Sequence, residues 1–371
     1  MAGDAQVKII FRADASLDIG TGHVMRCLTL ADALRACGAT CRFVCRAHPG
    51  HLIEQIRQRG FETTALPSAT TETSAPAADG TAQPAHAHWL GADWQTDAEQ
   101  TRAALRDERV DWLIIDHYAL DARWDRSLRG VCRRLMVIDD LADRPHDCDL
   151  LLDQNLGRSA ADYAVLVPGG CTILAGPQYA LLRPEFAALR ADSLARRERP
   201  QLRRLLITMG GVDKDNATGR VLDALRRCLL PPDCRITVVM GPHAPWLEPV
   251  RKQAAEMLWP TEVLVDVRDM AGLMADSDLA IGAAGTTAWE RCCLGVPSIS
   301  MILAPNQKAG AVALSDAGAV LLAAEGGFAT AIEKCIREVS RTDGLAALSA
   351  AARTVTDGAG TMRLVEAITN E

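Results

Sequence analysis

The sequence lacks the features that mark a membrane protein or a nucleic-acid-binding protein. Its 371 residues contain no apolar run long enough to span a bilayer, and the first residues show no signal-peptide pattern. The formal net charge is −7 and no long basic run is present, so a nucleic-acid-binding face is not indicated. We therefore expect a cytoplasmic protein whose partner is a small molecule rather than a membrane or a nucleic acid. We also expect it to be a monomer, although neither feature determines the oligomeric state.

Aromatic residues are scarce, at 4% of the chain, whereas hydrophobic residues make up 49% and are mostly alanine and leucine. This composition favours helices packed on parallel strands. Cysteine is not scarce, but the twelve cysteines form no CxxC pair and no Cys/His cluster with the spacing of a zinc site. We therefore expect buried, reduced thiols rather than metal ligands or disulfides.

Short apolar segments alternate with helix-like segments along the whole chain. The expected strands in the first half are VKIIF, TCRFVC, WLIID, LMVID, DLLLD and CTILAG; those in the second half are RLLITMG, RITVVMG, VLVDV, LAIGA, SISMIL and AVLLA. This order predicts an α/β protein with two doubly wound, Rossmann-like domains. The charged stretch at residues 190–204 separates them, which gives domains at residues 1–190 and 200–355 and a final short helix at 360–371.

Residues 67–88 interrupt this pattern. They are rich in alanine, threonine, serine and proline and cannot bury much apolar area, so we expect a mobile loop. His86 and His88, at the end of this segment, are expected to be exposed to solvent.

The turn GTGHVMR at residues 20–26 joins a strand-like run to a helix-like run. It lacks the third glycine of a dinucleotide fingerprint and the lysine of a P-loop, which disfavours NAD binding and P-loop chemistry. Its backbone N–H groups at a helix N-terminus suit a phosphate or a developing negative charge. His23 is either a local cap of this helix or a general base in the ligand crevice, which in open α/β sheets lies beyond the strand carboxyl ends.

Two turns in the second half are candidate phosphate sites. The loop at residues 283–287 and the helix that follows suit a diphosphate, and Glu290 one turn in would accept hydrogen bonds from ribose hydroxyls. The alternative for Glu290 is a capping box with Thr287. Gly210 and Gly211 would let a backbone approach a phosphate closely, or would form a plain turn with Asp215 or Asn216 as the helix cap.

Three further segments carry polar groups at expected strand ends. The acid, histidine and tyrosine of DHY at residues 116–118 form either part of a site or a satisfied polar cluster. LAPNQ at residues 303–307 brings two amides to the expected crevice, although loop amides are commonly turn formers. VRDMAGLM at residues 267–274 is a candidate for binding uracil, or an ordinary loop that leads into a helix.

Taken in order, six segments resemble the UDP-sugar hydrolases of pseudaminic acid biosynthesis. They are RADASLDIGTGHVMRCLTLA, LIIDHYAL, VIDDLADRPHDCDLLLDQN, GPQYALLRPEF, ITMGGVDKDN and GTTAWERCCLGVPSI. The resemblance extends over nearly the whole chain, except for the loop at 67–88, and the second half alone also resembles the wider group that includes the MurG glycosyltransferases.

This resemblance implies a GT-B fold with the site in an inter-domain cleft and a final helix that crosses back to the first domain. It also implies metal-free, cofactor-free hydrolysis of UDP-2,4-diacetamido-2,4,6-trideoxy-β-L-altropyranose, in which water attacks the anomeric carbon with inversion and UDP leaves. The implied catalytic residues are His23, Tyr118 and Asn306. The implied substrate- and UDP-binding residues are Gly20, Thr21, Gly22, Arg26, Gly210, Gly211, Val267, Gly285, Thr286, Thr287, Glu290 and Gln307.

Three other functions stay open at this stage. A MurG-type transferase would need an acceptor, often a lipid, and a membrane-facing patch, which the sequence does not indicate. A hydrolysing 2-epimerase would need groups that take the C2 proton, and no such signature is found. A UDP-sugar-binding protein without turnover is disfavoured by the intact GTGH turn.

Overall fold

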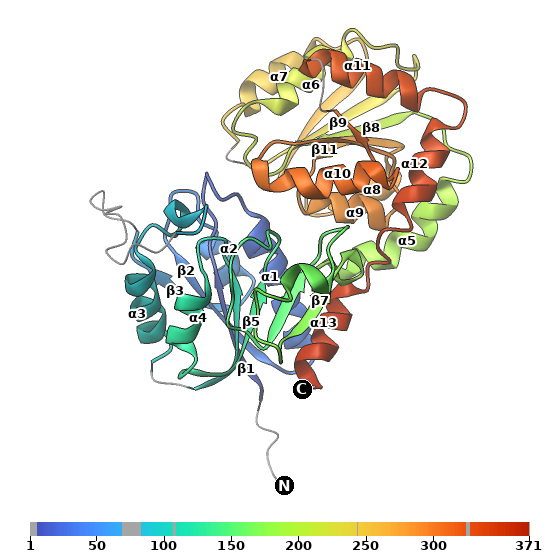
Figure 1. Ribbon diagram of the computed structural model, residues 1–371. Helices are drawn as coiled ribbons and strands as arrows, with labels where there is room; N and C mark the ends of the chain where they lie inside the picture. The colour runs from blue at the N-terminus through green and yellow to red at the C-terminus, as the bar shows by residue number, and fades with distance from the viewer. Residues whose placement is uncertain (1–5, 69–82, 107–108, 243, 324–326, 371) are drawn as a thin grey trace. The chain divides into compact units, whose positions relative to one another are not determined.

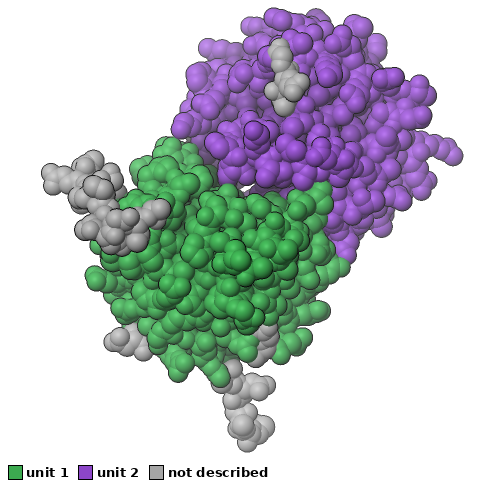
Figure 2. Space-filling model, in the orientation of Figure 1, with its two compact units in different colours: residues 1–181, 361–371 green, residues 182–360 purple. Residues whose placement is uncertain are grey.

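The protein divides into two compact units, described here from a computed structural model (Figures 1 and 2). Unit 1 comprises Met1–Leu181 and Thr361–Glu371, and unit 2 comprises Leu182–Gly360. The structure describes residues 6–68, 83–106, 109–242, 244–323 and 327–370. Most of the loop expected at 67–88 lies outside the described residues. No described helix has both the length and the apolar character needed to cross a membrane.

Unit 1 is built on a parallel sheet of seven strands in the order β3-β2-β1-β4-β5-β6-β7. The strands are β1 (Lys8–Ala13), β2 (Thr40–Arg46), β3 (Glu62–Leu66), β4 (Val110–Asp116), β5 (Cys132–Ile138), β6 (Leu150–Asp153) and β7 (Thr172–Ala175). The strand order reverses between β1 and β4. In a doubly wound sheet, this switch point is where ligands bind, beyond the strand carboxyl ends.

Helices cover both faces of this sheet, so its central strands are apolar on both sides. Unit 1 contains α1 (Gly22–Ala36), α2 (Ile53–Gln58), α3 (Trp94–Ala104), α4 (Ala122–Leu128), α13 (Gly360–Thr369) and the 3₁₀ turns η1 (Ala87–Leu90), η2 (Ala160–Tyr163) and η3 (Pro177–Tyr179). Side chains of α1, α2 and α13 pack in one buried cluster, and those of α3 and α4 pack in a second. Alternate β1 residues supply the two clusters: Ile9 and Phe11 the first, Ile10 the second.

Unit 2 repeats this plan with a parallel sheet of six strands in the order β10-β9-β8-β11-β12-β13. The strands are β8 (Arg204–Thr208), β9 (Arg235–Met240), β10 (Thr261–Val265), β11 (Leu279–Ala283), β12 (Ser298–Met301) and β13 (Leu321–Leu322). The helices are α5 (Pro184–Arg196), α6 (Ala217–Leu225), α7 (Leu247–Ala255), α8 (Met270–Asp276), α9 (Thr287–Cys293), α10 (Lys308–Asp316), α11 (Phe328–Val339) and α12 (Gly344–Ala352), with a 3₁₀ turn η4 (Pro305–Gln307). Here the switch point lies between β8 and β11.

The division between the units falls before Leu182 rather than within residues 190–204, so α5 belongs to unit 2. Hydrogen bonds from α5 explain this, because the hydroxyl of Ser193 donates to the carbonyl of Leu294 at 2.8 Å and Arg190 donates to the carbonyl of Arg353 at 2.7 Å. At the other end of the chain, α13 returns to unit 1 (Figure 1). Its Leu364 and Ile368 are buried there.

One strand was not expected from the sequence. β3 (Glu62–Leu66) reads ETTAL, which carries a charge and two threonines and no run of apolar residues. It pairs with β2 at the edge of the sheet, where Glu62 is exposed and Thr63 is buried. The pattern of apolar segments did not predict β3, because this strand is polar.

Candidate active site

The GTGHVMR turn lies at the switch point of the unit 1 sheet. β1 and β4 are neighbours with Ala13 opposite Asp116, and α1 begins at Gly22 directly after the turn that follows β1. Gly20 takes a positive φ of 80°, which favours glycine, and its N–H bonds to the carbonyl of Ser16 at 2.9 Å. The chain path therefore brings the first turn of α1 to the end of β4.

His23 and Asp116 form a buried hydrogen-bonded pair there. The His23 Nδ1 lies 2.5 Å from an Asp116 carboxylate oxygen, and the two residues are 7% and 0% exposed. Burial alone would raise the pKa of Asp116, but the Arg26 charge and hydrogen bonds from Arg26 and His23 outweigh it and hold that pKa well below its usual range. Because the carboxylate is ionised, it accepts the Nδ1 proton, which leaves Nε2 as the ring nitrogen that can take up a proton.

The alternative of a local helix cap for His23 is therefore wrong. The N-cap of α1 is Thr21, which makes no side-chain cap hydrogen bond, and the Nδ1 partner of His23 is Asp116 of β4. An imidazole oriented by a carboxylate, with its second nitrogen available, is the arrangement of a general base.

Arg26 connects this pair to a second carboxylate. Its guanidinium donates to Asp116 at 2.6 and 2.7 Å and to Asp140 at 2.5 Å, and Arg26 is 4% exposed. Tyr118 also donates its hydroxyl to Asp140, at 2.7 Å. Burial and the charge of Asp140 raise the pKa of Tyr118 well above its usual value, so the hydroxyl stays protonated. The structure thus places Arg26 as a brace between two carboxylates.

Aromatic rings pack around the His23 side chain and its neighbour Tyr118. The Tyr118 ring meets the His23 ring edge-on, with centroids 4.5 Å apart, and Trp89 of η1 stacks on Tyr118 at 5.8 Å. His86 lies 4.4 Å from the Trp89 ring and is half-buried, so the expectation that it is an exposed loop residue is wrong. His88 is exposed, as expected. Asp140 and Trp89 were missed by the sequence reasoning.

The middle residue of DHY has a different role from its neighbours. His117 Nε2 lies 3.3 Å from the carboxylate of Asp14, and its Nδ1 accepts the backbone N–H of Ala119 at 3.1 Å. His117 is 3% exposed, and Asp14 is also held by Arg12 at 2.6 Å. The polar-cluster interpretation therefore fits His117, which anchors the segment, whereas Asp116 and Tyr118 both join the His23 group.

In unit 2 the first glycine turn leads into a helix whose leading amides are already bonded. The Asp213 carboxylate accepts the N–H groups of Ala217 and Thr218 at 2.8 and 2.9 Å, and Asn216 accepts that of Gly219 at 3.1 Å. Asn216 is thus the N-cap of α6, as one of the two alternatives predicted. Gly210 has a φ of 93° and begins the turn.

The turn after β11 is different, because the α9 N-terminus carries no side-chain cap. Thr286 is the N-cap and makes no side-chain cap hydrogen bond. The capping box of Thr287 and Glu290 is not formed, since the helix begins at Thr287 and Glu290 falls one position too late to reach the cap. Beneath the turn, the buried Arg291 donates to the carbonyl of Ala283 at 2.9 Å and to the Thr287 hydroxyl at 3.2 Å.

Glu290 carries a perturbed carboxyl. Burial raises its pKa to about 7, although the guanidinium of Arg183, 4.0 Å away, opposes that shift. Its side chain is 17% exposed. A carboxyl that is partly protonated near neutral pH either donates or accepts a hydrogen bond, which suits contact with a hydroxyl group.

The two predicted amides follow β12, the neighbour of β11. Asn306 and Gln307 both belong to η4 and are half-buried. The Gln307 side chain accepts the N–H of Leu303 at 2.9 Å and lies beside Gly285. The structure thus brings Gln307 and the Gly285 turn together.

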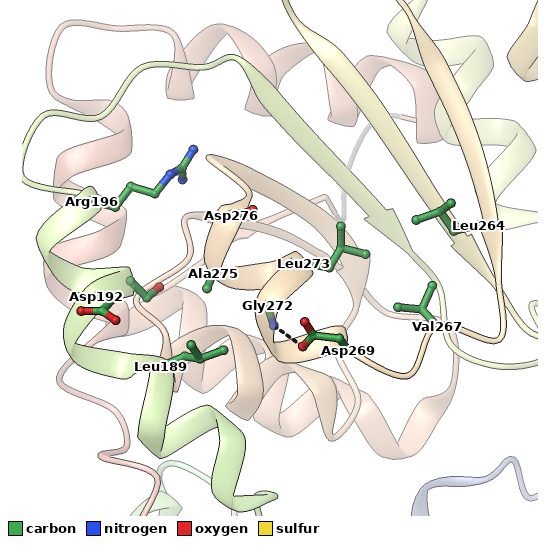
Figure 3. A pocket seen from close by; sticks show the side chains of 11 residues that line it. Leu189, Asp192, Arg196, Leu264, Val267, Asp269, Gly272, Leu273, Ala275 and Asp276 are labelled. Carbon is green, nitrogen blue, oxygen red and sulfur yellow. Dashed lines mark hydrogen bonds between the residues drawn. The ribbon is translucent and has the colours of Figure 1, made fainter.

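Val267 lines a cavity of about 600 Å³ next to α5 and α8 (Figure 3). Leu264, Leu273 and Leu189 supply apolar walls, and Asp269 caps α8 by accepting the N–H of Gly272 at 2.8 Å. Part of the segment expected to bind uracil therefore borders a cavity. Among the described residues, no group of three or more histidine, cysteine or acidic side chains is arranged to hold a metal.

Comparisons with known proteins agree with this architecture. MurG of Acinetobacter baumannii superposes with a TM-score of 0.68 at 15% identity over 99% of this chain and 100% of that one. A putative UDP-N-acetylglucosamine 2-epimerase of Listeria monocytogenes gives 0.60 at 14% identity over 99% of this chain and 96% of that one. The fold is GT-B. The two Rossmann-like domains predicted from the sequence are confirmed.

Sequence relatives are more specific. A UDP-2,4-diacetamido-2,4,6-trideoxy-β-L-altropyranose hydrolase of Campylobacter jejuni is 26% identical over 84% of this chain and 97% of its own length. The spore coat polysaccharide biosynthesis protein SpsG of Bacillus subtilis is 34% identical over 42% of this chain. The chain spans about half the length of SpsG and of an uncharacterized Methanocaldococcus jannaschii protein that is 23% identical over 79% of this chain. No family model matches the sequence. The resemblance expected from the six segments is confirmed.

Proposed function

We propose that this protein is an enzyme that acts on a UDP-linked sugar, and that it hydrolyses UDP-2,4-diacetamido-2,4,6-trideoxy-β-L-altropyranose to UDP and the free sugar. The observation that carries the proposal is the buried His23–Asp116 pair at the switch point of unit 1. The similarity to the Campylobacter jejuni hydrolase supports the choice of substrate. A water molecule is the second reactant.

His23 acts as the general base in this proposal. Asp116 keeps the proton on Nδ1, and Nε2 takes a proton from the attacking water. The water oxygen bonds to the anomeric carbon as the bond from that carbon to the UDP oxygen breaks, with inversion. The bonding electrons leave with UDP, and because a diphosphate is a good leaving group, no strong general acid is required.

Unit 2 binds the UDP part of the substrate. The backbone of Gly285, Thr286 and Thr287 faces the diphosphate at an N-terminus without an acidic cap, and the buried Arg291 below it adds positive charge. Glu290 contacts the ribose. The other proposed UDP contacts in this unit are Gly210, Gly211, Val267 and Gln307.

Two side chains, Tyr118 and Asn306, position the sugar in this proposal. Tyr118, whose hydroxyl is held by Asp140, presents its ring beside His23, and Asn306 hydrogen-bonds to an acetamido group. The turn at Gly20, Thr21 and Gly22 bounds the space for one water molecule, and Arg26 keeps both carboxylates in place. Neither a metal nor another cofactor enters the proposed reaction.

The experiment is hydrolysis in ¹⁸O-labelled water with a chelator present. We expect UDP release with the label on the free sugar, and loss of turnover in His23→Asn with UDP affinity retained. Label on the phosphate would contradict attack at carbon. UDP release only after an acceptor is added would instead identify a transferase, and UDP binding without release would identify a binding protein.

A further inference from the structure

An aromatic surface adjoins the proposed base, and one of its rings, the indole of Trp89, has no role in the reaction described above. Trp89 stacks on Tyr118 with an interplanar angle of 25° and meets His23 edge-on, with centroids 6.5 Å apart. The His86 ring packs beside both of these rings, with its centroid 4.4 Å from that of Trp89 and 5.6 Å from that of Tyr118. Two rings, Trp89 and Tyr118, thus contact the His23 imidazole, and His86 packs against both of them.

Trp89 is held in place by its neighbours. Leu90, the next residue, is 2% exposed and packs in a buried cluster of unit 1. Gly91 ends η1 with a φ of 68°, and a Cβ there would lie 2.7 Å from the His48 ring, so only glycine allows η1 to approach this closely. The indole therefore sits on an anchored turn.

The indole is not part of the core. Trp112 and Trp124 of the same unit are 3% and 0% exposed, whereas Trp89 is half-buried. A half-buried indole beside the His23 and Tyr118 rings leaves apolar surface in contact with water. Covering that surface with a ligand is favourable, and binding pockets typically combine such aromatic walls with a few polar groups.

We propose that Trp89 is the residue against which the sugar ring packs, and that this contact positions the anomeric carbon at His23 and favours a sugar with apolar substituents. The inference rests on the proposed function. A 6-deoxy sugar has a methyl group where glucose has a hydroxymethyl group, and each acetamido group adds another methyl. These groups bury apolar area on an indole without leaving a hydroxyl unpaired. Because Asp140 holds the Tyr118 hydroxyl, the ring on which the indole stacks is fixed in place.

The test compares the affinity for the UDP-sugar with the affinity for UDP. The contribution of the nucleotide cancels in the ratio of the two, which leaves the contribution of the sugar. In a His23→Asn background, calorimetry with UDP-2,4-diacetamido-2,4,6-trideoxy-β-L-altropyranose and with UDP gives the ratio of the two Kd values. We expect Trp89→Ala to lower the preference for UDP-sugar about tenfold and Trp89→Phe about threefold or less, because a smaller ring keeps part of the contact. UDP affinity alone should not change.

Trp94→Phe is the matched control. Trp94 is half-buried on α3 of the same unit and packs with Arg123, 5.7 Å away, rather than with His23, and its buried Nε1 has no hydrogen-bond partner among the described residues. This variant should keep the wild-type ratio. Thermal unfolding of all variants separates a lost contact from a lost fold, and Trp89→Phe retains the ring if Trp89→Ala fails to fold.

Kinetics with His23 intact provide the second readout. Trp89→Phe should raise KM more than it lowers kcat and should leave the pH profile unchanged. An unaltered Kd ratio in the folded Trp89 variants, or a wild-type protein that binds UDP-sugar no better than UDP, would overturn the inference even if the wild type hydrolyses the substrate. A reduced ratio in a protein that releases no sugar would support the inference while the hydrolase proposal fails.

Discussion

Asp116 of β4 holds His23 of α1 through a hydrogen bond of 2.5 Å between two buried side chains that are 93 residues apart in the chain. Arg26, one helical turn after His23, donates twice to the same carboxylate. The histidine that the sequence motif singled out is therefore one part of a group assembled from a helix and a neighbouring strand. The consequences of this geometry are testable.

Replacing the orienting carboxylate should impair the base without removing it. In Asp116→Asn we expect kcat to fall about 10²- to 10⁴-fold, because the amide no longer holds the Nδ1 proton and Nε2 loses its fixed orientation. Steady-state hydrolysis measures this. UDP affinity should not change, because the substitution lies in unit 1. A variant with wild-type kcat would contradict the role of the pair.

The same substitution should change acid stability. Asp116 has a folded-state pKa below its unfolded value, so its ionised form stabilises the fold above the ordinary carboxyl pKa of 3.8, and this contribution is lost as the pH falls below that value. Denaturant unfolding of wild type and Asp116→Asn should therefore differ most at neutral pH and converge in acid. A difference that stays constant with pH would rule out the ionised carboxylate as the source.

Tyr118→Phe removes the hydroxyl that Asp140 accepts at 2.7 Å but keeps the ring beside His23. Because a hydrogen bond to a charged group is lost in a buried site, we expect the free energy of unfolding to fall by about 1–3 kcal/mol. The ring still packs against His23, so the pH profile of kcat should be retained. Urea denaturation and a pH–rate profile measure the two effects, and Tyr118→Leu, which lacks the ring, serves as the comparison.

Gly285→Ala tests whether a diphosphate approaches the protein backbone of the turn after β11. A Cβ at Gly285 would have the Gln307 side chain 3.7 Å away as its nearest neighbour, which is ordinary contact, so the fold should tolerate it. If a diphosphate lies on this backbone, the methyl group should weaken UDP binding about tenfold or more. Gly130→Ala, where the new Cβ would have no neighbour within 4 Å, is the control. Equal UDP affinity in both variants would place the diphosphate elsewhere.

Glu290 should make stability fall as the pH rises. Burial raises its folded-state pKa to about 7 from 4.5, so the folded protein binds more protons than the unfolded chain between these values, and the free energy of unfolding decreases with pH across that window. Glu290→Gln should remove this slope. The free energy of unfolding of the variant, relative to that of wild type, should therefore be about 1–3 kcal/mol higher at pH 8 than at pH 4. Unfolding curves at several pH values provide the measurement.

UDP binding by wild type should show the opposite dependence. If the ionised Glu290 accepts hydrogen bonds from the ribose, affinity should rise through about pH 7, and Glu290→Gln should bind more weakly with no such rise. Calorimetry with UDP at pH 6 and pH 8 checks this. The reverse trend would mean that the protonated carboxyl is the form that binds.

The tandem α/β pattern was readable from the chain because central parallel strands are buried on both faces and appear as short apolar runs between helices. The edge strand β3 could not be predicted in this way, since its sequence contains threonines and a glutamate and no apolar run. The unit boundary also differed. Residues 190–204 look like a linker because they are charged, yet α5 is fixed to unit 2 through specific hydrogen bonds such as that from Ser193 to Leu294.

Local spacing by itself determined that a glycine turn with His23 follows the first strand and that a small-residue turn follows LAIGA at residues 279–283. Only the tertiary structure decided which residues surround His23. Asp140 follows β5 and accepts from Arg26, and Trp89 of η1 meets the His23 ring, although neither residue is near His23 in sequence. Asp140 comes close to the end of β4 because the strand carboxyl ends meet at one edge of a parallel sheet. A motif records short-range geometry, whereas the charge and packing around a side chain depend on which strands become neighbours.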